Sequence, residues 1–260
     1  MSVIYNDGPQ GLSSARNLAI QQSQSDIIAF VDDDALLDKH WVNEIIRNYA
    51  EDNSVIGVTG PIMPLWENDH MSWFPPEFYW IFSCTNNDPK DKVEVRNGYG
   101  TNLSFDRKAF TQAGLFNPDL GVKGRGKKGW QEPGAEELEL SLRIKRISGK
   151  RIIFNPKVKV QHKVYTYRMT SQFISKRAYW EGFAKALLNS RYPASKSGAN
   201  VLSTEHALLK RILFHRIPQD LKLIFRHPIT GIKQLCVVFM VLSCVAAGYF
   251  NCKLKRYLAK

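Results

Sequence analysis

Residues 27–34 read IIAFVDDD, an unbroken apolar run that ends in three aspartates. A run of this kind is typical of a strand buried on both faces of a parallel sheet. A helical pattern precedes it at residues 13–22 and another follows at 41–49, before a second apolar strand at 55–58. This order predicts an α/β fold in which the aspartates stand at the carboxyl end of a strand, where such sheets bind ligands.

The α/β pattern continues as far as residue 188. Residues 62–97 are rich in aromatic side chains and proline, and predict an irregular, aromatic-lined excursion. Later elements expected from the periodicity are helices at 107–113, 135–148 and 172–188, strands at 151–154 and 158–161, and a Gly- and Lys-rich loop at 121–129. Residues 191–200, RYPASKSGAN, predict a linker, which would separate a domain at residues 1–190 from a tail at 201–260.

Basic charge is concentrated in this tail. The chain of 260 residues has a formal net charge of +12, and residues 201–260 hold ten basic and two acidic side chains. Because these charges surround an apolar stretch at 235–250, they indicate an anionic membrane surface as a partner. The small remaining excess in the folded region argues against a nucleic-acid partner.

The apolar stretch at 235–250 would span about 24 Å as a helix, less than the ~30 Å hydrocarbon thickness. A single crossing would also export the basic residues that follow it, against the positive-inside tendency. We therefore expect the tail to lie in the interface or to re-enter, with the first domain on the cytoplasmic side of the cell membrane. Because the N-terminal residues are polar, we expect no signal peptide. Four cysteines without metal spacing indicate buried thiols in a reducing compartment.

The aspartates are the first candidates for chemistry. Asp32, Asp33 and Asp34 repel one another unless a cation neutralises them. Mg²⁺ or Mn²⁺ does this while keeping coordination positions for the phosphate oxygens of a nucleotide. An acidic trio at an exposed turn is also common without any ion, so the motif alone leaves both explanations open.

Two further candidates lie later in the chain. Glu136 and Glu137 begin a predicted helix, and His162 follows an apolar strand. Acidic residues at a helix start also complement the helix dipole, and a histidine after a strand can be an ordinary core residue. Each feature taken singly therefore has a structural explanation.

Taken together and in order, four blocks resemble the family 2 glycosyltransferases of the GT-A fold. The blocks are GLSSARNLAI (11–20), FVDDDALLDKHW (30–41), GYGTNLSFDRKAF (98–110) and GAEELELSLRIKRISGKRIIFNPKVKVQHK (134–163). The resemblance covers residues 8–185 and implies a catalytic domain with a Rossmann-like mixed sheet flanked by helices, followed by a helical membrane-associated tail. The family normally begins with two additional βα units that bind the base, about 60 residues at ~30 per unit. We therefore expect an N-terminally incomplete catalytic domain.

The resemblance also implies roles for the residues in these blocks. Glu137 would be the general base, or Glu136 if the register is shifted by one, because the family usually shows Glu-Asp at this pair. The metal, Mg²⁺ or Mn²⁺, would be held by Asp34, Asp32 and His162. The donor-binding residues would be Arg16, Asn17, Asp32, Asp33 and Asn102.

The reaction that the resemblance implies is inverting transfer of one sugar from a nucleotide-sugar donor, a UDP-sugar above all, to a lipid-linked or glycan acceptor. Residues 172–188 and the tail are similar to transferases that extend dolichyl- or polyprenyl-linked sugars in glycan assembly and protein glycosylation. Gln172, Arg177 and Trp180 do not have the spacing of the QxxRW motif of processive synthases, which favours transfer of a single sugar. The alternative is a truncated, non-catalytic remnant that acts as a membrane-bound partner.

Overall fold

The computed structural model describes residues 3–86, 89–121, 134–192 and 202–258. The chain forms two compact units, one of residues 1–65 and 83–163 and the other of residues 66–82 and 164–260. Residues 122–129 of the predicted loop and 193–200 of the predicted linker lie outside the described residues. The predicted domain limits at 190 and 200 therefore stay predictions.

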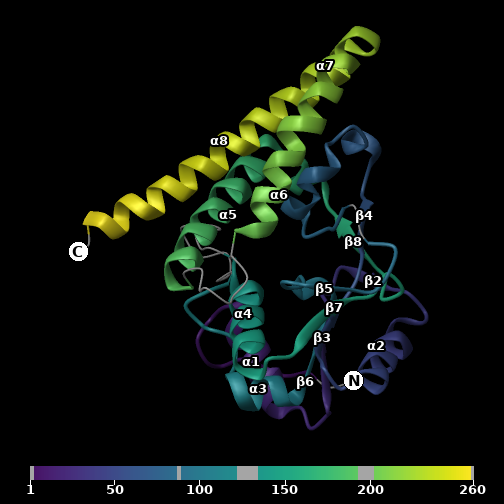
Figure 1. Ribbon diagram of the computed structural model, residues 1–260, viewed down its shortest axis with the longest axis vertical. Coiled ribbons are helices and arrows are strands. Elements are labelled where there is room, and N and C mark those ends of the chain that lie inside the picture. The colour runs from purple at the N-terminus through teal and green to yellow at the C-terminus, as the bar shows by residue number, and fades with distance from the viewer. Residues whose placement is uncertain (1–2, 87–88, 122–133, 193–201, 259–260) are drawn as a thin grey trace. The chain divides into compact units, whose positions relative to one another are not determined.

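A mixed sheet forms the centre of the first unit (Figure 1). Its order is β1-β6-β3-β7-β5, and only β3 and β7 pair in parallel. The strands are β1 Ile27–Phe30, β3 Val55–Thr59, β5 Val93–Val95, β6 Leu103–Asp106 and β7 Arg151–Phe154. The predicted mixed α/β sheet is therefore confirmed.

Strand β1 differs from the expectation of a strand buried within a parallel sheet. Among the described strands it pairs with β6 alone, antiparallel, from Ile27 opposite Asp106 to Phe30 opposite Leu103. Ala29 is exposed, whereas all five residues of β3 are buried. The prediction was wrong for β1 because a short apolar run does not distinguish an edge strand from a central one.

Helices cover both faces of this sheet (Figure 1). α1 (Leu12–Gln22), α3 (Arg107–Ala113) and α4 (Glu136–Ser148) lie on one face, and α2 (Trp41–Glu51) lies on the other. The first core joins these helices to the sheet through Ile20, Phe105, Phe110, Leu140 and Ile144, and the second through Trp41, Ile45, Val58 and Ile153. The buried side chains of the helices and strands therefore occur at the apolar spacing seen in the sequence.

A second sheet of three strands has the order β2-β8-β4. Its strands are β2 Ala35–Leu37, β8 Val160–Val164 and β4 Ile62–Trp66. β2 and β8 are antiparallel with Ala35 opposite His162, and the Lys163 amide donates to the Asp34 carbonyl over 2.9 Å. This register places the end of the aspartate motif beside His162.

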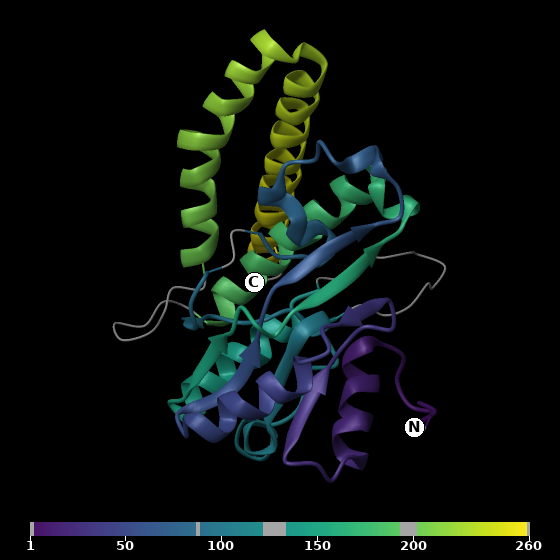
Figure 2. The same cartoon turned by 90° about the vertical axis from the view of Figure 1, so that its right-hand side faces the viewer.

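The second unit is mainly helical (Figure 2). It contains α5 Ser171–Arg191, α6 Ser203–Arg211, the π-helical turn η5 Ile212–Arg216, α7 Ile217–Arg226, α8 Pro228–Leu258 and, before them, the 3₁₀ segment η2 Pro76–Phe82. α5 and α8 approach closely at Gly182 and Gly248. A Cβ atom at either glycine would overlap a backbone carbonyl of the other helix, that of Val245 or Tyr179 respectively, so larger residues are excluded there.

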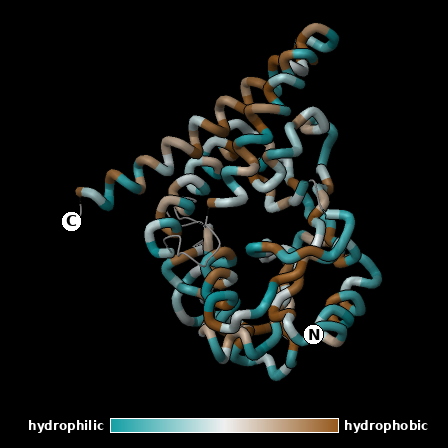
Figure 3. The backbone as a smooth tube through the Cα atoms, in the orientation of Figure 1, coloured by the Kyte–Doolittle hydropathy of each residue, from teal (hydrophilic) through white to brown (hydrophobic). Residues whose placement is uncertain are grey.

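α8 is longer than the apolar stretch that the sequence analysis used. Its 31 residues span about 46 Å at ~1.5 Å per residue, because the helix continues past both ends of the apolar run. By length and composition it is one helix capable of crossing a membrane, and most of its length is hydrophobic (Figure 3). The whole helix is therefore longer than the ~24 Å estimated for its apolar stretch, and the placement of the tail in the interface stays a prediction. Cys236 in this helix is exposed, contrary to the expectation of buried thiols.

Candidate active site

Two of the three aspartates and a histidine form a cluster in the first unit. Asp32, Asp34 and His162 each offer one ligand atom, and these atoms lie within 4.8 Å of one another. The His162 Nε2 atom is 3.1 Å from Asp34 Oδ1, and the His162 ring is buried. Asp33 is exposed. The central aspartate of the motif is thus exposed, whereas the two flanking aspartates lie beside the histidine.

The buried side of His162 contacts a residue that the sequence analysis did not select. Cys84 Sγ lies 3.9 Å from His162 Nδ1, and Cys84 is buried. An interaction at Nδ1 orients the imidazole so that Nε2 is directed at Asp34. No motif in the sequence marks Cys84, because it lies within the irregular region at 62–97.

Asp32 is held by a second residue that sequence reasoning missed. The Thr101 hydroxyl donates to Asp32 Oδ2 over 2.5 Å, and Thr101 is buried in the 3₁₀ turn η3, Gly100–Asn102. This bond fixes the orientation of the carboxylate. The sequence could have indicated Thr101 only by its position, since it stands beside Asn102 in the block GYGTNLSF.

Arg16 connects the aspartates to the acidic pair. Its guanidinium is 2.8 Å from Glu137 Oε1, 3.6 Å from Glu136 Oε1 and 3.9 Å from Asp32 Oδ1. The residue is only 8 % exposed. A buried cation in contact with three carboxylates joins α1, the aspartate motif and the start of α4 into one charged site.

The surroundings of Arg16 support its charge. Burial acts to lower the pKa of Arg16, but Glu137, Glu136 and Asp32 outweigh that effect and raise it above the ordinary value. The guanidinium also lies 5.6 Å from the ring centre of Phe30 and 5.5 Å from that of Phe116. The cation is thus held between acids and aromatic faces.

The acidic pair occupies the N-terminus of α4, where the helix dipole favours negative charge. Glu136 has a side chain 3 % exposed and Glu137 one 20 % exposed. Leu140 and Ile144 anchor the helix in the core. The exposure of Glu137 makes it the member of the pair that a ligand can reach.

The two predicted asparagines are joined to the protein framework. The Asn102 side chain is fully buried, accepts from Trp41 Nε1 over 2.9 Å and donates to the carbonyl of Val158 over 2.7 Å. Asn17 exchanges two hydrogen bonds with the backbone of Phe116. Their predicted roles in donor binding stay predictions, and the observed bonds show that both side chains position the elements around Arg16 and Asp32.

Comparison with known proteins identifies the class of this site. Residues 1–114 match the family described as glycosyl transferase family 2. These residues therefore resemble the family 2 glycosyl transferases. Over 246 residues it is 29 % identical to the glucosyl-dolichyl phosphate glucuronosyltransferase of Haloferax volcanii, an alignment that covers 94 % of this chain and 75 % of that protein. The chain therefore resembles an enzyme of lipid-linked sugar assembly, as the sequence analysis predicted.

One solved structure supports the predicted fold. The mannosyltransferase PcManGT from Pyrobaculum calidifontis, solved in complex with GDP-Man and Mn²⁺, matches with a TM-score of 0.56 and 17 % identity. The match covers 96 % of this chain and 69 % of PcManGT. GalNAc-T7, solved with UDP, GalNAc and Mn²⁺, matches with a TM-score of 0.46 and 13 % identity over 79 % of this chain and 41 % of that chain, too low to support an argument. The likeness to PcManGT confirms the predicted GT-A fold.

Proposed function

We propose that the protein is a metal-dependent, inverting glycosyltransferase that moves one sugar from a nucleotide-sugar donor to a hydroxyl group of a sugar linked to dolichyl phosphate. The relative from Haloferax volcanii is named for a glucosyl-dolichyl phosphate acceptor, and PcManGT was solved with a nucleotide sugar. One arrangement of side chains supports the proposal most: the cluster of Asp32, Asp34 and His162, linked by Arg16 to Glu137.

The cluster suits a divalent cation by its donor set. Two carboxylates and one imidazole with ligand atoms within 4.8 Å of one another can share one ion. Mg²⁺ binds oxygen ligands almost alone, so the imidazole of His162 favours Mn²⁺. A bound ion would neutralise charge on the donor diphosphate as the nucleotide leaves. Asp32, Asp34 and His162 would hold it, with Thr101 and Cys84 orienting two of these ligands.

Glu137 is the proposed general base. It is more exposed than Glu136, and its contact with Arg16 at 2.8 Å keeps the side chain in one orientation. An ionised carboxylate in this position would take the proton of the acceptor hydroxyl as that oxygen attacks the anomeric carbon. Attack from the side opposite to the nucleotide gives inversion. Arg16 serves as a positioning residue, since it contacts the base and a proposed metal ligand together.

The helices of the second unit agree with an acceptor that is a lipid. α8 is long and apolar enough to cross a membrane, and basic residues surround it in the sequence. A polyprenyl-linked sugar is confined to the bilayer surface, so an enzyme that acts on it gains from membrane attachment. We place the family 2 domain on the cytoplasmic side, where nucleotide sugars are made available to the enzyme.

Metal binding tests the first part of the proposal. Asp34→Ala should weaken Mn²⁺ binding by more than ~100-fold, beyond the 10- to 100-fold typical of outer ligand partners, whereas Asp33→Ala should change it little because Asp33 is exposed. Free Mn²⁺ measured by electron paramagnetic resonance gives the affinity without any need for turnover. Equal losses in the two variants would refute this ligand assignment.

Transfer kinetics test the second part. Glu137→Gln should lower turnover by about 10²- to 10⁴-fold while the affinity for the nucleotide sugar stays nearly unchanged, because the base acts on the acceptor proton alone. Glu136→Gln is the matched control and should retain measurable turnover. A reversed pattern would move the base to Glu136, and full activity in both variants would show that the pair only begins a helix.

A further inference from the structure

Helix α8 presents one side to the second unit and an uncharged side to its surroundings. Only 28 % of its most apolar 18-residue stretch is buried within the protein. Six exposed residues follow one another at intervals of three or four positions: Ile232, Cys236, Phe239, Ser243, Ala246 and Phe250. These intervals place them on one face of the helix, and no residue from 234 to 252 is charged. An apolar face of this length on a protein surface indicates that a lipid or another protein covers it.

The opposite side of α8 is attached to the second unit at both ends of this uncharged segment. The Gln234 side chain donates to the Trp73 carbonyl over 2.7 Å. Near the other end, the Asn251 side chain donates to the Tyr179 hydroxyl of α5. Between these contacts, Gly248 lies so close to α5 that a Cβ atom would overlap the Tyr179 carbonyl. α8 therefore cannot enter a bilayer lengthwise unless α5 and the segment around Trp73 enter with it.

Charges on α5 oppose such a crossing. Gly182 of α5 packs against the backbone of Val245, which is near the middle of the uncharged segment. The residue before this glycine, Glu181, forms an ion pair with Lys185 at 3.1 Å. A crossing centred on the apolar part of α8 would place both charges near the middle of the bilayer, where charged side chains are most costly. The packing of α8 on α5 therefore favours a helix that lies along a membrane.

The width of the exposed side favours lipid over a second protein helix. Four flanking apolar residues are also exposed or half-buried, namely Leu235, Met240, Leu242 and Ala247. With them, the apolar side covers roughly 160° of the helix at ~100° per residue. Two helices that pack as a coiled coil need only a narrower stripe of two positions per heptad. A lipid surface, by contrast, covers a wide face of a helix.

Basic side chains flank the uncharged segment at both ends. Lys233 precedes it, Lys253 and Lys255 follow it, and all three are exposed. Each lysine near an anionic lipid surface adds a favourable attraction. The aliphatic stems can lie on the apolar side while the ammonium groups reach the lipid head groups. An anionic membrane therefore complements α8 in charge as well as in hydrophobicity.

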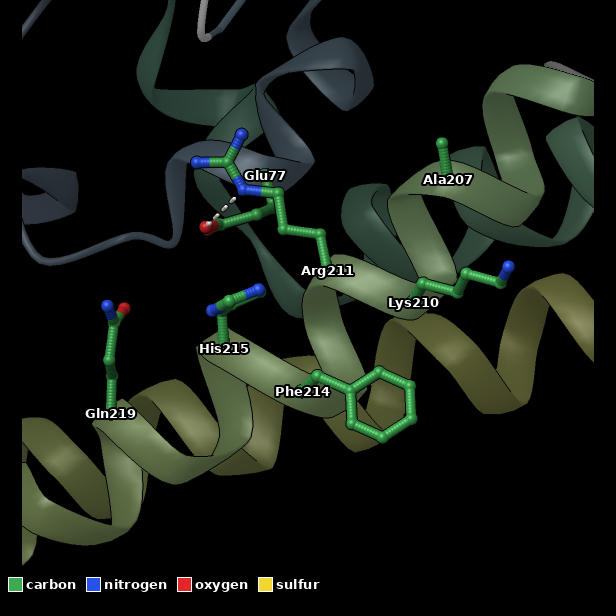
Figure 4. Close-up of a pocket in the computed structure, with 7 residues that line it drawn as sticks. All are labelled: Glu77, Ala207, Lys210, Arg211, Phe214, His215 and Gln219. Carbon is green, nitrogen blue, oxygen red and sulfur yellow. Dashed lines mark ion pairs between the residues drawn. The ribbon is translucent and has the colours of Figure 1, made fainter.

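Acidic side chains do not oppose this attraction. α8 contains no acidic residue. The acidic residues of α6 and α7 are held in the ion pairs Glu205–Lys185 at 2.9 Å and Asp220–Arg216 at 2.8 Å. Glu77 of η2 is likewise turned toward Arg211, at 3.8 Å (Figure 4). The exposed charge of α7 and α8 is therefore positive.

We infer that α8 lies along the surface of an anionic membrane without crossing it, with the face from Ile232 to Phe250 in the lipid and the opposite face on α5. This placement goes beyond the proposed function, which requires attachment to a membrane but not a particular mode of attachment. Because α8 is one continuous helix, the placement also excludes the re-entrant tail that the sequence left open.

Vesicle binding of the full chain tests the lipid-facing side. The vesicles contain phosphatidylcholine and phosphatidylglycerol, and binding is measured by co-sedimentation. Phe239→Ser and Phe250→Ser should each weaken binding by about tenfold, because these side chains are 58 % and 67 % exposed and would lose their burial in lipid. Ile147→Ser is the matched control, since Ile147 is 55 % exposed on α4 of the first unit, and it should stay within about twofold of the wild type. Binding by both phenylalanine variants that equals that of the control would overturn the inference.

The lipid charge is tested with the same assay. The wild type should bind pure phosphatidylcholine vesicles more weakly than the anionic vesicles. Lys253→Gln should weaken binding to the anionic vesicles by about fivefold and leave binding to pure phosphatidylcholine nearly unchanged. Equal binding of the wild type to both kinds of vesicle would overturn the assignment of an anionic surface.

Nitroxide labels along the exposed face distinguish a helix on the membrane from one that crosses it. Cysteines are introduced one at a time in a protein whose four native cysteines are replaced by serine, as Ile232→Cys, Phe239→Cys, Ala246→Cys and Leu254→Cys. Electron paramagnetic resonance with oxygen and a water-soluble nickel complex gives the depth of each label. All four labels should lie at a similar depth of ~5–10 Å. Labels that are deepest at Phe239 and Ala246, at ~15 Å, and shallow at the two ends would show a crossing and overturn the inference.

The same labels reveal a second copy of the chain as the cover of this face. Labels that are shielded from both oxygen and nickel, and broadened by a label on another molecule, would show that α8 pairs with α8 and would overturn the inference. If the protein without native cysteines does not fold, vesicle binding decides, because it uses the native cysteines. Neither measurement needs sugar transfer, so their failure would leave the proposed reaction intact, and a lack of transfer would leave the placement of α8 intact.

Discussion

Replacement of Arg16 by methionine should destabilise the first unit more than any surface charge substitution. The guanidinium is 8 % exposed and contacts Glu137, Glu136 and Asp32. Methionine fills much of the same space between the rings of Phe30 and Phe116, so the main loss is the charge. Removal of one partner from a buried ion pair typically costs ~3–5 kcal/mol, because the remaining charge is left uncompensated.

This cost corresponds to a fall in melting temperature of ~6–20 °C at ~2–4 °C per kcal/mol. Intrinsic tryptophan fluorescence during heating measures it, since Trp41 is buried in the first unit. Arg47→Met is the matched control. Arg47 has a side chain 56 % exposed and pairs with Glu44 and Glu51 on the surface of α2, a contact worth ~0–1 kcal/mol.

The Arg16 guanidinium itself should add no pH dependence to stability between pH 5 and pH 8. Although burial acts to lower its pKa, Glu137, Glu136 and Asp32 raise it above the ordinary value, so the cation stays charged throughout this range. A loss no greater than that of Arg47→Met would refute the view of Arg16 as the link within the site.

Three further outcomes follow from other contacts. Gly100→Ala should cost ~1–3 kcal/mol of stability in thermal unfolding, because its Cβ would overlap Arg16 and Glu137. The control Gly149→Ala has open space around its Cβ but a φ of 66°, and should cost only ~1 kcal/mol. Equal costs would contradict the close approach at Gly100. Thr101→Val should weaken Mn²⁺ binding by about 10-fold in resonance titrations, since Asp32 loses the donor that orients it, and an unchanged affinity would remove Asp32 from the ligand set. The last outcome concerns a reporter cysteine at Lys260 in a protein that lacks the four native cysteines. If the tail lies on one side of the membrane, this cysteine should be protected from an impermeant reagent until the cells are lysed. Labelling of intact cells would show that α8 crosses the membrane.

The elements of the fold could be predicted because they depend on local patterns. The apolar spacing of residues 13–22 and 107–113 and the helix after Ala135 match α1, α3 and α4 to within a residue. Strand order is different in kind, because pairing joins residues far apart in the chain. β1 therefore took an edge position that its apolar sequence did not indicate.

The sequence indicated which residues belong to the site, but not how they are arranged in space. The order of the blocks named Asp32, Asp34 and His162, but their proximity depends on the β2–β8 register, which no local pattern encodes. Thr101 and Cys84 were missed for the same reason, since each acts on a residue at least 69 positions away. The role of Arg16 as a link between three acids also emerged only from the folded arrangement.

The tail shows a different limit of sequence reasoning. The apolar run at 235–250 was treated as the whole helix, yet α8 extends from Pro228 to Leu258. Lysine and arginine are good helix formers, so charged ends lengthen a helix without lengthening its apolar part. Span estimates from apolar runs alone therefore underestimate the helix.

The mass of the lipid acceptor after one incubation shows whether the protein transfers a sugar to it. Purified protein is incubated with Mn²⁺, glucosyl dolichyl phosphate and each of a panel of nucleotide sugars in turn. The mass of the extracted lipid is then measured by mass spectrometry, with Glu137→Gln in a parallel reaction. We predict that the lipid mass increases by one sugar with one of the donors, and that this increase depends on Mn²⁺ and is lost in Glu137→Gln. An unchanged lipid mass with every donor, or an increase that persists in Glu137→Gln, would contradict it.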